Sequence, residues 1–322
     1  MASSVEESPP DAEEQQQLRN RHYNAQIIRR VDAHENLAIF RVRPDAPIPS
    51  FQAGQYVALG LGYWESRIQP SQAETVPAKK LRKLVRRAYS ISCPMLDDKN
   101  QLAACDDVDY LEFYITLVRE AGEPDGKPPA LTPRLFQLGE GDRLRVESNI
   151  VGRYVLEGVQ PDDTLLLIAT GTGEAPHNAM AARLLRDGHR GPILMATTGR
   201  YIGDFAYREI HQELMRRYSN FRSLNFTTRE PQNVDPEHPQ YVGKQYIQEL
   251  FQSGHLAELC GTDLSPKNTH VFLCGNPAMI GYMPPGAPPP KSPGMLQILQ
   301  QVGFVHNDEP PTAGHIRFEK YW

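Results

Sequence analysis

The run LLLIATGTGEAPHNAM, residues 165–180, has the composition of an anion-binding site. Its apolar start, Leu165 to Ala169, is typical of a parallel strand buried on both faces. Gly171 and Gly173 then allow a sharp turn and close approach to a ligand, and Pro176 suits the first turn of a helix. Free N–H groups and the helix dipole would meet at one point, which favours phosphate. The spacing G-T-G-x-x-P differs from G-x-G-x-x-G, and a plain structural turn is the alternative.

A second phosphate-type arrangement occurs earlier in the chain. The tetrapeptide RAYS, residues 87–90, places Arg87 and Tyr89 on one face of a strand and Ser90 on the other. An arginine suits a pyrophosphate, an aromatic ring stacks on a flat heterocycle, and a hydroxyl can hydrogen-bond a ring nitrogen. LTPRL, residues 131–135, predicts a helix start with Thr132 as N-cap. An ordinary strand and an ordinary cap are the alternatives. The helix start at 131–135 and the glycine turn at 171–173 are two phosphate-type sites, one per domain, and together they suggest two nucleotides.

Other reactive residues follow predicted strand ends in the second half of the chain. Arg200, Arg229 and Lys244 would suit an extra phosphate, as on NADP rather than NAD, or are solvated surface charges. Cys274, in LCGNPAM, would lie near the reacting ring of a bound dinucleotide, or is a small buried hydrophobe. The terminal FEKYW either packs on protein or stacks on a cofactor.

Composition limits the class of protein. The chain has 322 residues, 40% hydrophobic and 23% charged, which predicts about two domains of a globular protein. A net charge of -5 argues against nucleic-acid binding, and no apolar run approaches the ~20 residues that span a bilayer. The four cysteines form no C-x-x-C and have no zinc spacing, so we expect no metal and reduced thiols in the cytoplasm. Residues 1–20 are predicted to be a disordered acidic tail rather than a secretory signal.

Two folding patterns divide the rest of the chain. Residues 21–158 contain about six short β-rich segments, which predicts an antiparallel barrel interrupted by one helix. These segments are a hairpin over 25–44 and runs at 51–64, 86–94, 110–120 and 142–157, the last giving two strands. The polar stretch 96–109 is predicted to be a hairpin loop. Residues 64–86 are either a solvated insertion or a basic docking patch for an acidic partner.

Residues 159–322 alternate strand, glycine turn and helix, which predicts a parallel sheet covered on both faces. Ligands of such sheets bind at the carboxyl ends of the strands. The residues expected there, and expected to share one crevice, are 170–173, 198–200, 228–229 and 274–277. The helix over 244–259 is expected to be continuous, and the proline-rich segment 283–294 is expected to be an exposed loop.

The ordered motifs RAYS, LTPRL, GTGEAP, TRE, CGNPAM and terminal EKYW resemble the ferredoxin/flavodoxin–NADP+ reductase family, most closely its bacterial type. The resemblance covers residues 21–322. It implies a six-stranded antiparallel FAD-binding β-barrel followed by a parallel-sheet α/β domain that binds NADP. It also implies roles for single residues. FAD contacts would come from Arg87, Ala88, Tyr89, Ser90, Tyr114, Ala130, Leu131, Thr132, Tyr321 and Trp322.

By the same resemblance, NADP contacts would come from Gly173, Arg200, Thr228, Arg229 and Lys244, with Arg229 on the 2′-phosphate, and Thr172 would lie where the two cofactors meet. Ser90, Cys274 and Glu319 would be the catalytic residues, with Ser90 near flavin N5. Glu174 departs from the family pattern, because a carboxylate beside the expected pyrophosphate must point away or weaken binding. The 64–86 and 283–294 segments are not features of the family pattern.

The expected enzyme transfers electrons between NADP(H) and a one-electron carrier, ferredoxin or flavodoxin, by hydride transfer to or from flavin N5. Its partner contacts would be transient and electrostatic, and the chain itself a monomer without a transmembrane segment. One alternative keeps the chemistry and delivers the electrons of NADPH to an oxygenase, free flavin or quinone. Another is a non-catalytic module that senses nucleotides.

Overall fold

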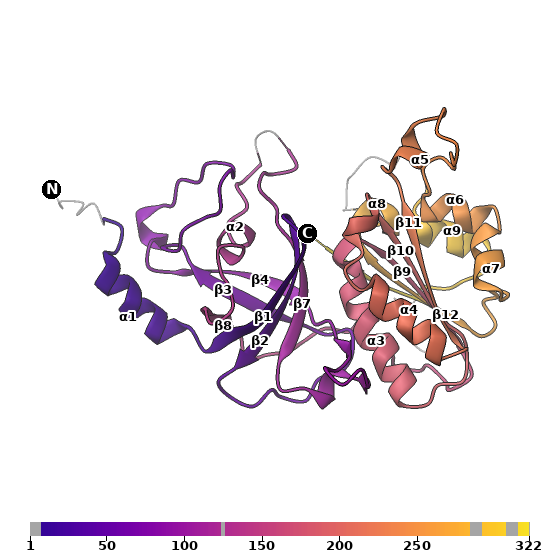
Figure 1. Cartoon of the computed structure of the whole chain (residues 1–322), viewed down its shortest axis with the longest axis horizontal. Helices are drawn as coiled ribbons and strands as arrows, with labels where there is room; N and C mark the ends of the chain where they lie inside the picture. Colours follow the sequence, from indigo (N-terminus) through magenta and orange to yellow (C-terminus); the bar gives the residue numbers. More distant parts are fainter. Residues whose placement is uncertain (1–7, 124–125, 284–291, 307–314, 322) are drawn as a thin grey trace. The chain divides into compact units, whose positions relative to one another are not determined.

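The computed structural model describes residues 8–123, 126–283, 292–306 and 315–321, which fall into two compact units (Figure 1). Unit 1 takes the described residues of Met1–Phe51, Gln55–Ile91 and Val108–Gly152, and unit 2 those of Gln52–Gly54, Ser92–Asp107 and Arg153–Trp322. The predicted division at 158/159 is therefore corrected. Residues 92–107 join unit 2 because the apolar Cys93, Met95 and Leu96 pack in one core with Met180 of the later helix.

Unit 1 is a six-stranded sheet in the order β4-β3-β8-β1-β2-β7, whose paired strands are antiparallel. Rings from the two outermost strands in this order, Tyr89 of β4 and Phe113 of β7, lie 6.5 Å apart, which indicates that the sheet curls on itself. The predicted six-stranded antiparallel barrel is confirmed. Its strands are β1 (Ala25–His34), β2 (Leu37–Pro44), β3 (Tyr56–Gly62), β4 (Leu84–Ser90), β7 (Leu111–Thr116) and β8 (Arg143–Val146).

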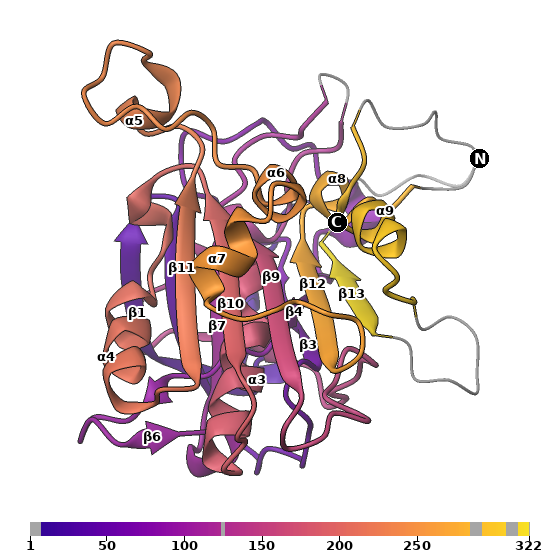
Figure 2. The same cartoon turned by 90° about the vertical axis from the view of Figure 1, so that its right-hand side faces the viewer.

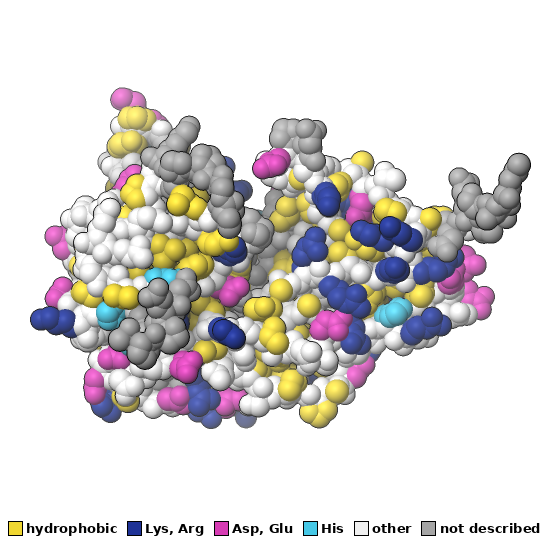
Figure 3. Space-filling view, turned by 180° about the vertical axis from the view of Figure 1, so that it is seen from behind, with side chains coloured by type: hydrophobic (Ala, Val, Ile, Leu, Met, Phe, Trp, Pro, Cys, Tyr) yellow, Lys and Arg dark blue, Asp and Glu magenta, His cyan; other side chains and the backbone are white. Residues whose placement is uncertain are grey.

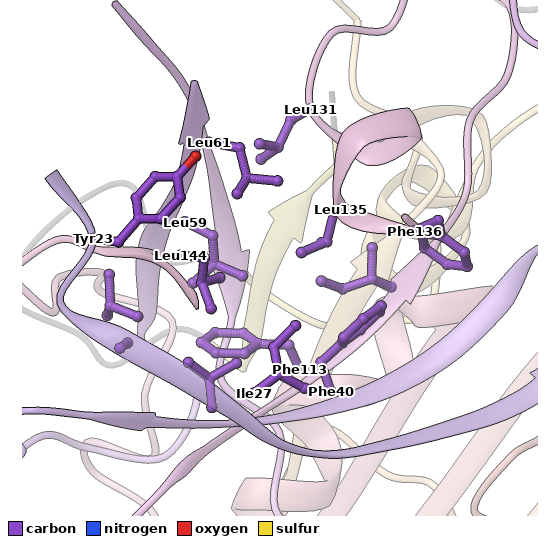
Figure 4. Close-up of a cluster of buried hydrophobic side chains, with 14 of the residues drawn as sticks. Tyr23, Ile27, Phe40, Leu59, Leu61, Phe113, Leu131, Leu135, Phe136 and Leu144 are labelled. Carbon is purple, nitrogen blue, oxygen red and sulfur yellow. The ribbon is translucent and has the colours of Figure 1, made fainter. Parts of the chain in front are cut away.

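The barrel closes around one apolar core (Figure 4). Alternate residues of the strands point inward, among them Ile27, Phe40, Leu59 and Phe113. The short helix α2 (Thr132–Leu135) adds Leu135 to the same core. Only one strand, β8, forms within 142–157; the second strand predicted there is reduced to the isolated bridge between residues 56 and 151.

The prediction of a disordered tail over residues 1–20 is wrong for its second half, because Ala12–His22 form helix α1. The Asp11 side chain caps this helix by accepting from the N–H of Glu14 at 2.9 Å. Arg19 binds both carboxylate oxygens of Glu65 at 2.9 and 2.7 Å, and Leu18 is buried in the barrel core. This acidic stretch thus forms a helix because it contacts specific residues later in the chain, namely Glu65 and the barrel core.

Unit 2 is built on a five-stranded parallel sheet in the order β11-β10-β9-β12-β13 (Figure 2). Helices cover both of its faces (Figure 1). Side chains of β9 alternate between them: Leu165 and Leu167 pack in the core that contains α3, and Leu166 and Ile168 in the core that contains α6, α7 and α9. The predicted doubly covered parallel sheet is confirmed, and its strands are β9 (Thr164–Thr170), β10 (Ile193–Gly199), β11 (Phe221–Thr227), β12 (Thr269–Gly275) and β13 (Ile316–Lys320).

The helices of unit 2 are α3 (Glu174–Arg186), α4 (Arg208–Arg217), α5 (Pro231–Val234), α6 (Ile247–Gln252), α7 (His255–Cys260), α8 (Pro277–Ile280) and α9 (Met295–Gln301). The helix predicted over 244–259 is divided, because Gly254 adopts a left-handed conformation with φ 79° between α6 and α7. The predicted loop 96–109 contains a small hairpin, β5 (Met95–Leu96) with β6 (Leu102–Ala103). Most of the predicted proline-rich loop lies outside the described residues. Within the described ranges, no helix is both long and apolar enough to traverse a bilayer.

Candidate functional site

The predicted ligand-binding edge of unit 2 is assembled from the carboxyl ends of its parallel strands. In the sheet register Thr198 stands beside Thr170, Gly199 beside Thr227, and Cys274 beside Ala169. Since all the strands run in one direction, the turns that follow them project from the same edge. The sheet thereby brings together segments that are more than 100 residues apart in the sequence.

At this edge two glycine turns pack backbone against backbone. A Cβ on Gly173 would lie 2.3 Å from the carbonyl oxygen of Cys274, and one on Gly275 would lie 2.3 Å from Oγ1 of Thr170. The same Thr170 Oγ1 accepts a hydrogen bond from Asn276 N at 2.7 Å. By contrast, a Cβ on Gly171, at φ +52°, would meet nothing within 4 Å. Gly173 and Gly275 therefore serve close packing, and the backbone at Gly171 remains open to a ligand.

We expect Gly173→Ala to destabilise the fold, because the added methyl group overlaps a backbone carbonyl that cannot rotate away. Overpacking of this kind costs about 1–3 kcal/mol of unfolding free energy. Gly203→Ala is the matched control, because a Cβ there meets nothing within 4 Å and its φ is not in the left-handed region. Urea unfolding of both variants measures the difference. Equal midpoints would contradict the close packing of the two turns.

The predicted catalytic residues Cys274 and Glu319 are register partners on β12 and β13. Cys274 is fully buried, and burial raises the pKa of its thiol well above the usual value, so the thiol stays protonated. Burial also raises the pKa of the half-buried Glu319 carboxyl, which favours proton retention. The Tyr321 N–H donates to Gly275 O at 3.0 Å, and its hydroxyl lies 3.4 Å from Thr172 O.

These contacts gather Thr172, Gly173, Cys274, Glu319 and Tyr321 at one end of the sheet in unit 2. Two interpretations of Cys274 were predicted, a small buried hydrophobe and a residue near the reacting ring. The structure is compatible with both, because the side chain is buried and also adjoins the predicted site. Trp322, predicted with Tyr321 to contact FAD, lies outside the described residues.

The predicted cationic group lies at the ends of β10 and β11. The N–H of Arg229 donates to the carbonyl of Arg200 at 2.9 Å, and the Thr228 hydroxyl donates to Gly199 O at 3.1 Å. Gln245 N donates to Thr227 O at 3.3 Å and holds the neighbouring Lys244 near the same strand end. The side chains of both arginines and of Lys244 are exposed. A pocket of about 440 Å³ lies beside Lys244, lined also by Gln245, Tyr246, Glu249 and Ser253.

Glu174 points away from this edge and into the protein. It is 1% exposed, accepts from the Thr197 hydroxyl at 3.2 Å through Oε1, and lies 3.7 Å from Nδ1 of His211. Within the described residues its Oε2 has no hydrogen-bond partner. Burial raises the pKa of Glu174 to about 8 and lowers that of His211 to about 3, so both groups are neutral near pH 7.

A buried polar network extends from this pair. His211 Nε2 bonds Asn178 Oδ1 at 2.9 Å and its Nδ1 bonds Ser223 Oγ at 3.0 Å. His177 lies on α3 one turn after Glu174. It is fully buried, and its Nε2 forms a hydrogen bond with the Tyr154 hydroxyl at 2.6 Å. Neither of these two histidines belongs to a site predicted from the sequence. The available signal was the helical spacing of polar residues 174, 177 and 178 on a helix otherwise rich in alanine and leucine.

In unit 1, the predicted RAYS residues lie on β4 at one end of the strand order. Arg87 and Ala88 are exposed, Tyr89 is half-buried against Phe113, and Ser90 is buried. Tyr114 is buried on β7, at the other end of the order. An exposed cation beside a partly buried aromatic ring is chemically suited to a dinucleotide with a flat ring system.

The predicted turn at 130–132 precedes and begins α2, where Ala130 and Leu131 are buried. Thr132 is not the N-cap that the sequence predicted. It is the first residue of the helix, Leu131 holds the cap position in the αR conformation, and no side chain caps the helix. The Thr132 hydroxyl instead bonds the N–H and C=O of Val118 at 3.1 and 3.2 Å and ties the turn to the segment after β7.

Comparison with known proteins places these features in a family. A family model described as an oxidoreductase NAD-binding domain matches residues 167–284, which span the glycine turns of unit 2. A flavodoxin/ferredoxin–NADP reductase of Escherichia coli (strain K12) is 32% identical over 246 residues, or 76% of this chain and 81% of that protein. The chain belongs to the flavodoxin/ferredoxin–NADP reductase family.

Solved structures show that the reductase fold is shared more widely. A ferredoxin NADP+ reductase from Neisseria gonorrhoeae, with bound FAD and NADP, has a TM-score of 0.67 at 19% identity and covers 92% of this chain and 98% of its own. The Amycolatopsis cytochrome P450 reductase GcoB has a TM-score of 0.60 at 20% identity, over 92% of this chain and 69% of its own. The fold is thus common to reductases with different acceptors.

For the reductase, the family predicted from the motifs and the oxidoreductase class are confirmed, whereas the roles of single residues stay predictions. Within the described residues, no group of three or more histidine, cysteine, aspartate or glutamate side chains could hold a metal ion. Of the predicted residues that the structure describes, those of unit 2 lie at one sheet edge and those of unit 1 lie on β4, on β7 and at the start of α2.

Proposed function

We propose that the protein is a flavodoxin/ferredoxin–NADP reductase that passes electrons between NADP(H) and a small one-electron carrier through FAD. Membership of the family carries this proposal. FAD is assigned to unit 1 and NADP(H) to unit 2. When bound, FAD supplies exchange of a hydride with nicotinamide and of single electrons with the carrier.

The residues of unit 1 fit the demands of FAD. Arg87 presents an exposed guanidinium to a pyrophosphate, with Tyr89 and Tyr114 for the ring system and Ser90 for a ring nitrogen. The backbone at Ala130, Leu131 and Thr132 is assigned to the same pyrophosphate. Tyr321 is assigned to the flavin ring by family resemblance, and Trp322 likewise.

The residues of unit 2 fit NADP(H) rather than NAD(H). The backbone at Gly171, open to approach, and the neighbouring Thr172 and Gly173 are assigned to the dinucleotide. Arg200, Arg229 and Lys244 supply exposed positive charge for the 2′-phosphate. Because Glu174 is buried and neutral near pH 7, it does not repel the cofactor phosphates. Glu319, whose pKa is raised, and the protonated thiol of Cys274 are assigned to the reacting end of the nicotinamide.

The proposed carrier is ferredoxin or flavodoxin, bound transiently by a monomeric enzyme in the cytoplasm. Support comes from cations of unit 1: Lys79, Lys80, Lys83, Arg86 and Arg87 are exposed. Figure 3 shows lysine and arginine side chains gathered on one face of this unit. A positive surface steers an acidic carrier and weakens with salt, which suits rapid exchange of partners.

An anaerobic absorption titration tests the proposal. The purified protein should show a flavin spectrum that NADPH bleaches much faster than NADH, and added oxidised flavodoxin should restore it. Bleaching at equal rates by both nucleotides would contradict the NADP assignment. A reduced protein that reoxidises with free flavin or quinone but not with flavodoxin or ferredoxin would favour the alternative acceptors. A colourless protein that does not take up FAD would support the non-catalytic alternative.

A further inference from the structure

The segment 64–77, which follows β3, is bound to the turn assigned to the FAD pyrophosphate. It is not the solvated insertion that its composition allows, since the side chains of Arg67 and Glu74 are each 10% exposed. Its polar groups reach residues 119, 121 and 126, and also residues 129, 133 and 134. These contacts indicate that the segment holds the neighbouring backbone in place.

The central contact is an ion pair between Glu74 and Arg134 of α2. Oε2 of Glu74 lies 2.8 Å from Nη1 of Arg134, whose side chain is 3% exposed. The same guanidinium donates to Ala130 O at 2.6 Å and to Tyr63 O at 3.0 Å, and lies 5.3 Å from the Tyr63 ring centroid. Arg134 therefore holds the carbonyl of Ala130, a residue of the assigned turn.

Arg67 holds the other side of the same turn. Its guanidinium donates to Pro129 O at 3.0 Å and to Gln72 O at 2.8 Å, and its Nε lies 3.7 Å from Oε2 of Glu74. In addition, Ile68 N donates to Pro133 O at 2.8 Å. Carbonyls at 129, 130 and 133 are thus all engaged, which leaves the N–H side of the turn as the side available to an anion.

Gln72 adds uncharged hydrogen bonds between the segment and the chain after β7. Gln72 donates through Nε2 to Gly126 O at 3.1 Å and accepts from Ala121 N at 2.8 Å, while its own N–H donates to Arg119 O at 2.8 Å. Through Thr132, the turn is tied to this same stretch at Val118. A helix of four residues such as α2 has little rigidity of its own, so these bonds determine where its backbone lies.

We propose that residues 64–77 form a brace that presets the turn at 129–132 for the FAD pyrophosphate, with Glu74 as its positioning residue. This inference rests on the assignment of FAD to unit 1. The brace acts through preorganisation: backbone donors that are already held in place lose little entropy when the anion binds. Oε2 of Glu74 lies near the guanidinium groups of both the buried Arg134 and the partly buried Arg67, so loss of its charge weakens the hold of both arginines on the turn.

Glu74→Gln in the full-length protein tests the brace, since geometry and charge predict opposite results. Loss of a negative charge near an anionic pyrophosphate would by itself tighten FAD binding. A loosened turn should instead weaken it, and we expect the dissociation constant for FAD to rise about tenfold. The ³¹P resonances of bound FAD should also shift. Glu140→Gln is the matched control, since it removes the same charge from an exposed pair in unit 1 and should change neither quantity.

Unchanged or tighter binding of FAD by the folded Glu74→Gln variant, with unchanged ³¹P resonances, would overturn the brace. If that variant does not fold, Gln72→Ala is the second test, because it removes uncharged side-chain hydrogen bonds of the segment. Weaker binding of FAD by Gln72→Ala would support the brace, and unchanged binding would refute it. Wild-type protein that binds no FAD would contradict the assignment of FAD itself, a result distinct from either.

Discussion

Glu174 is expected to lower the unfolding free energy of the wild-type protein by about 2 kcal/mol between pH 6.5 and 8, and Glu174→Gln is expected to remove this contribution. Burial raises the pKa of Glu174 from 4.5 to about 8. A raised folded-state pKa gives stability that is complete below the unfolded pKa and is lost as the pH rises through the folded one. Over this window the unfolded state has already released the proton that the folded state retains.

Over the lower part of this window the nearby histidines act in the opposite direction, because their unfolded-state pKa is about 6.5. Burial lowers the pKa of His177 and His211 to about 3, so their contribution to stability is present above about pH 6.5 and is lost as the pH falls. Chemical unfolding at several pH values measures the slope. Glu209→Gln, an exposed carboxylate in the first turn of α4, is the matched control and should retain the wild-type slope. A Glu174→Gln variant with that same slope would show that Glu174 is ionised in the folded protein.

Arg229→Ala is expected to lower kcat/KM for NADPH by roughly 10- to 100-fold and to leave NADH almost unaffected. A charged hydrogen bond to a phosphate contributes about 1.5–3 kcal/mol, and NADH lacks the phosphate that this arginine would bind. The exposed side chain of Arg229 leaves the end of β11, where its backbone N–H is held by Arg200 O. Stopped-flow reduction of the flavin by each nucleotide gives the two rates.

Arg222→Ala is a suitable control for this substitution. Arg222 is an exposed arginine at the opposite end of β11, where its Nη1 donates to Leu259 O at 3.1 Å. It should alter neither rate. If Arg229→Ala slowed NADPH and NADH equally, the arginine would contact a part common to both nucleotides, and the 2′-phosphate would have to rely on Arg200 or Lys244.

Several features were predictable from local sequence because their physical causes are local. The apolar run of β9 requires burial on both faces, and the glycines after it permit a turn, so a strand and a turn were expected whatever their neighbours. Alternation in 25–44 likewise predicted the β1–β2 hairpin. The order of six short motifs sufficed for the family, since their joint occurrence is far more specific than any one of them.

Other features depended on partners distant in sequence. Helix α1 forms in a stretch whose composition predicts disorder, because Arg19 and Leu18 find Glu65 and the barrel core. Residues 92–107 joined unit 2 through apolar contacts with α3. The N-cap predicted at Thr132 failed because its hydroxyl bonds Val118 instead of the helix backbone.

Local sequence specified most of the strands and the chemistry that the turns after them can perform, since backbone preference, side-chain period and donor type are properties of neighbouring residues. The tertiary structure decided the environment of each titratable group. The sequence predicts a Glu174 carboxylate that must point away or weaken cofactor binding, and burial makes it a neutral acid beside Thr197 and His211. Glu74 lies in a segment for which the sequence predicts either a solvated insertion or a basic docking patch, and folding brings its carboxylate next to the buried Arg134. Desolvation and ion pairing depend on what surrounds a group in space, and no pattern of neighbours along the chain specifies that.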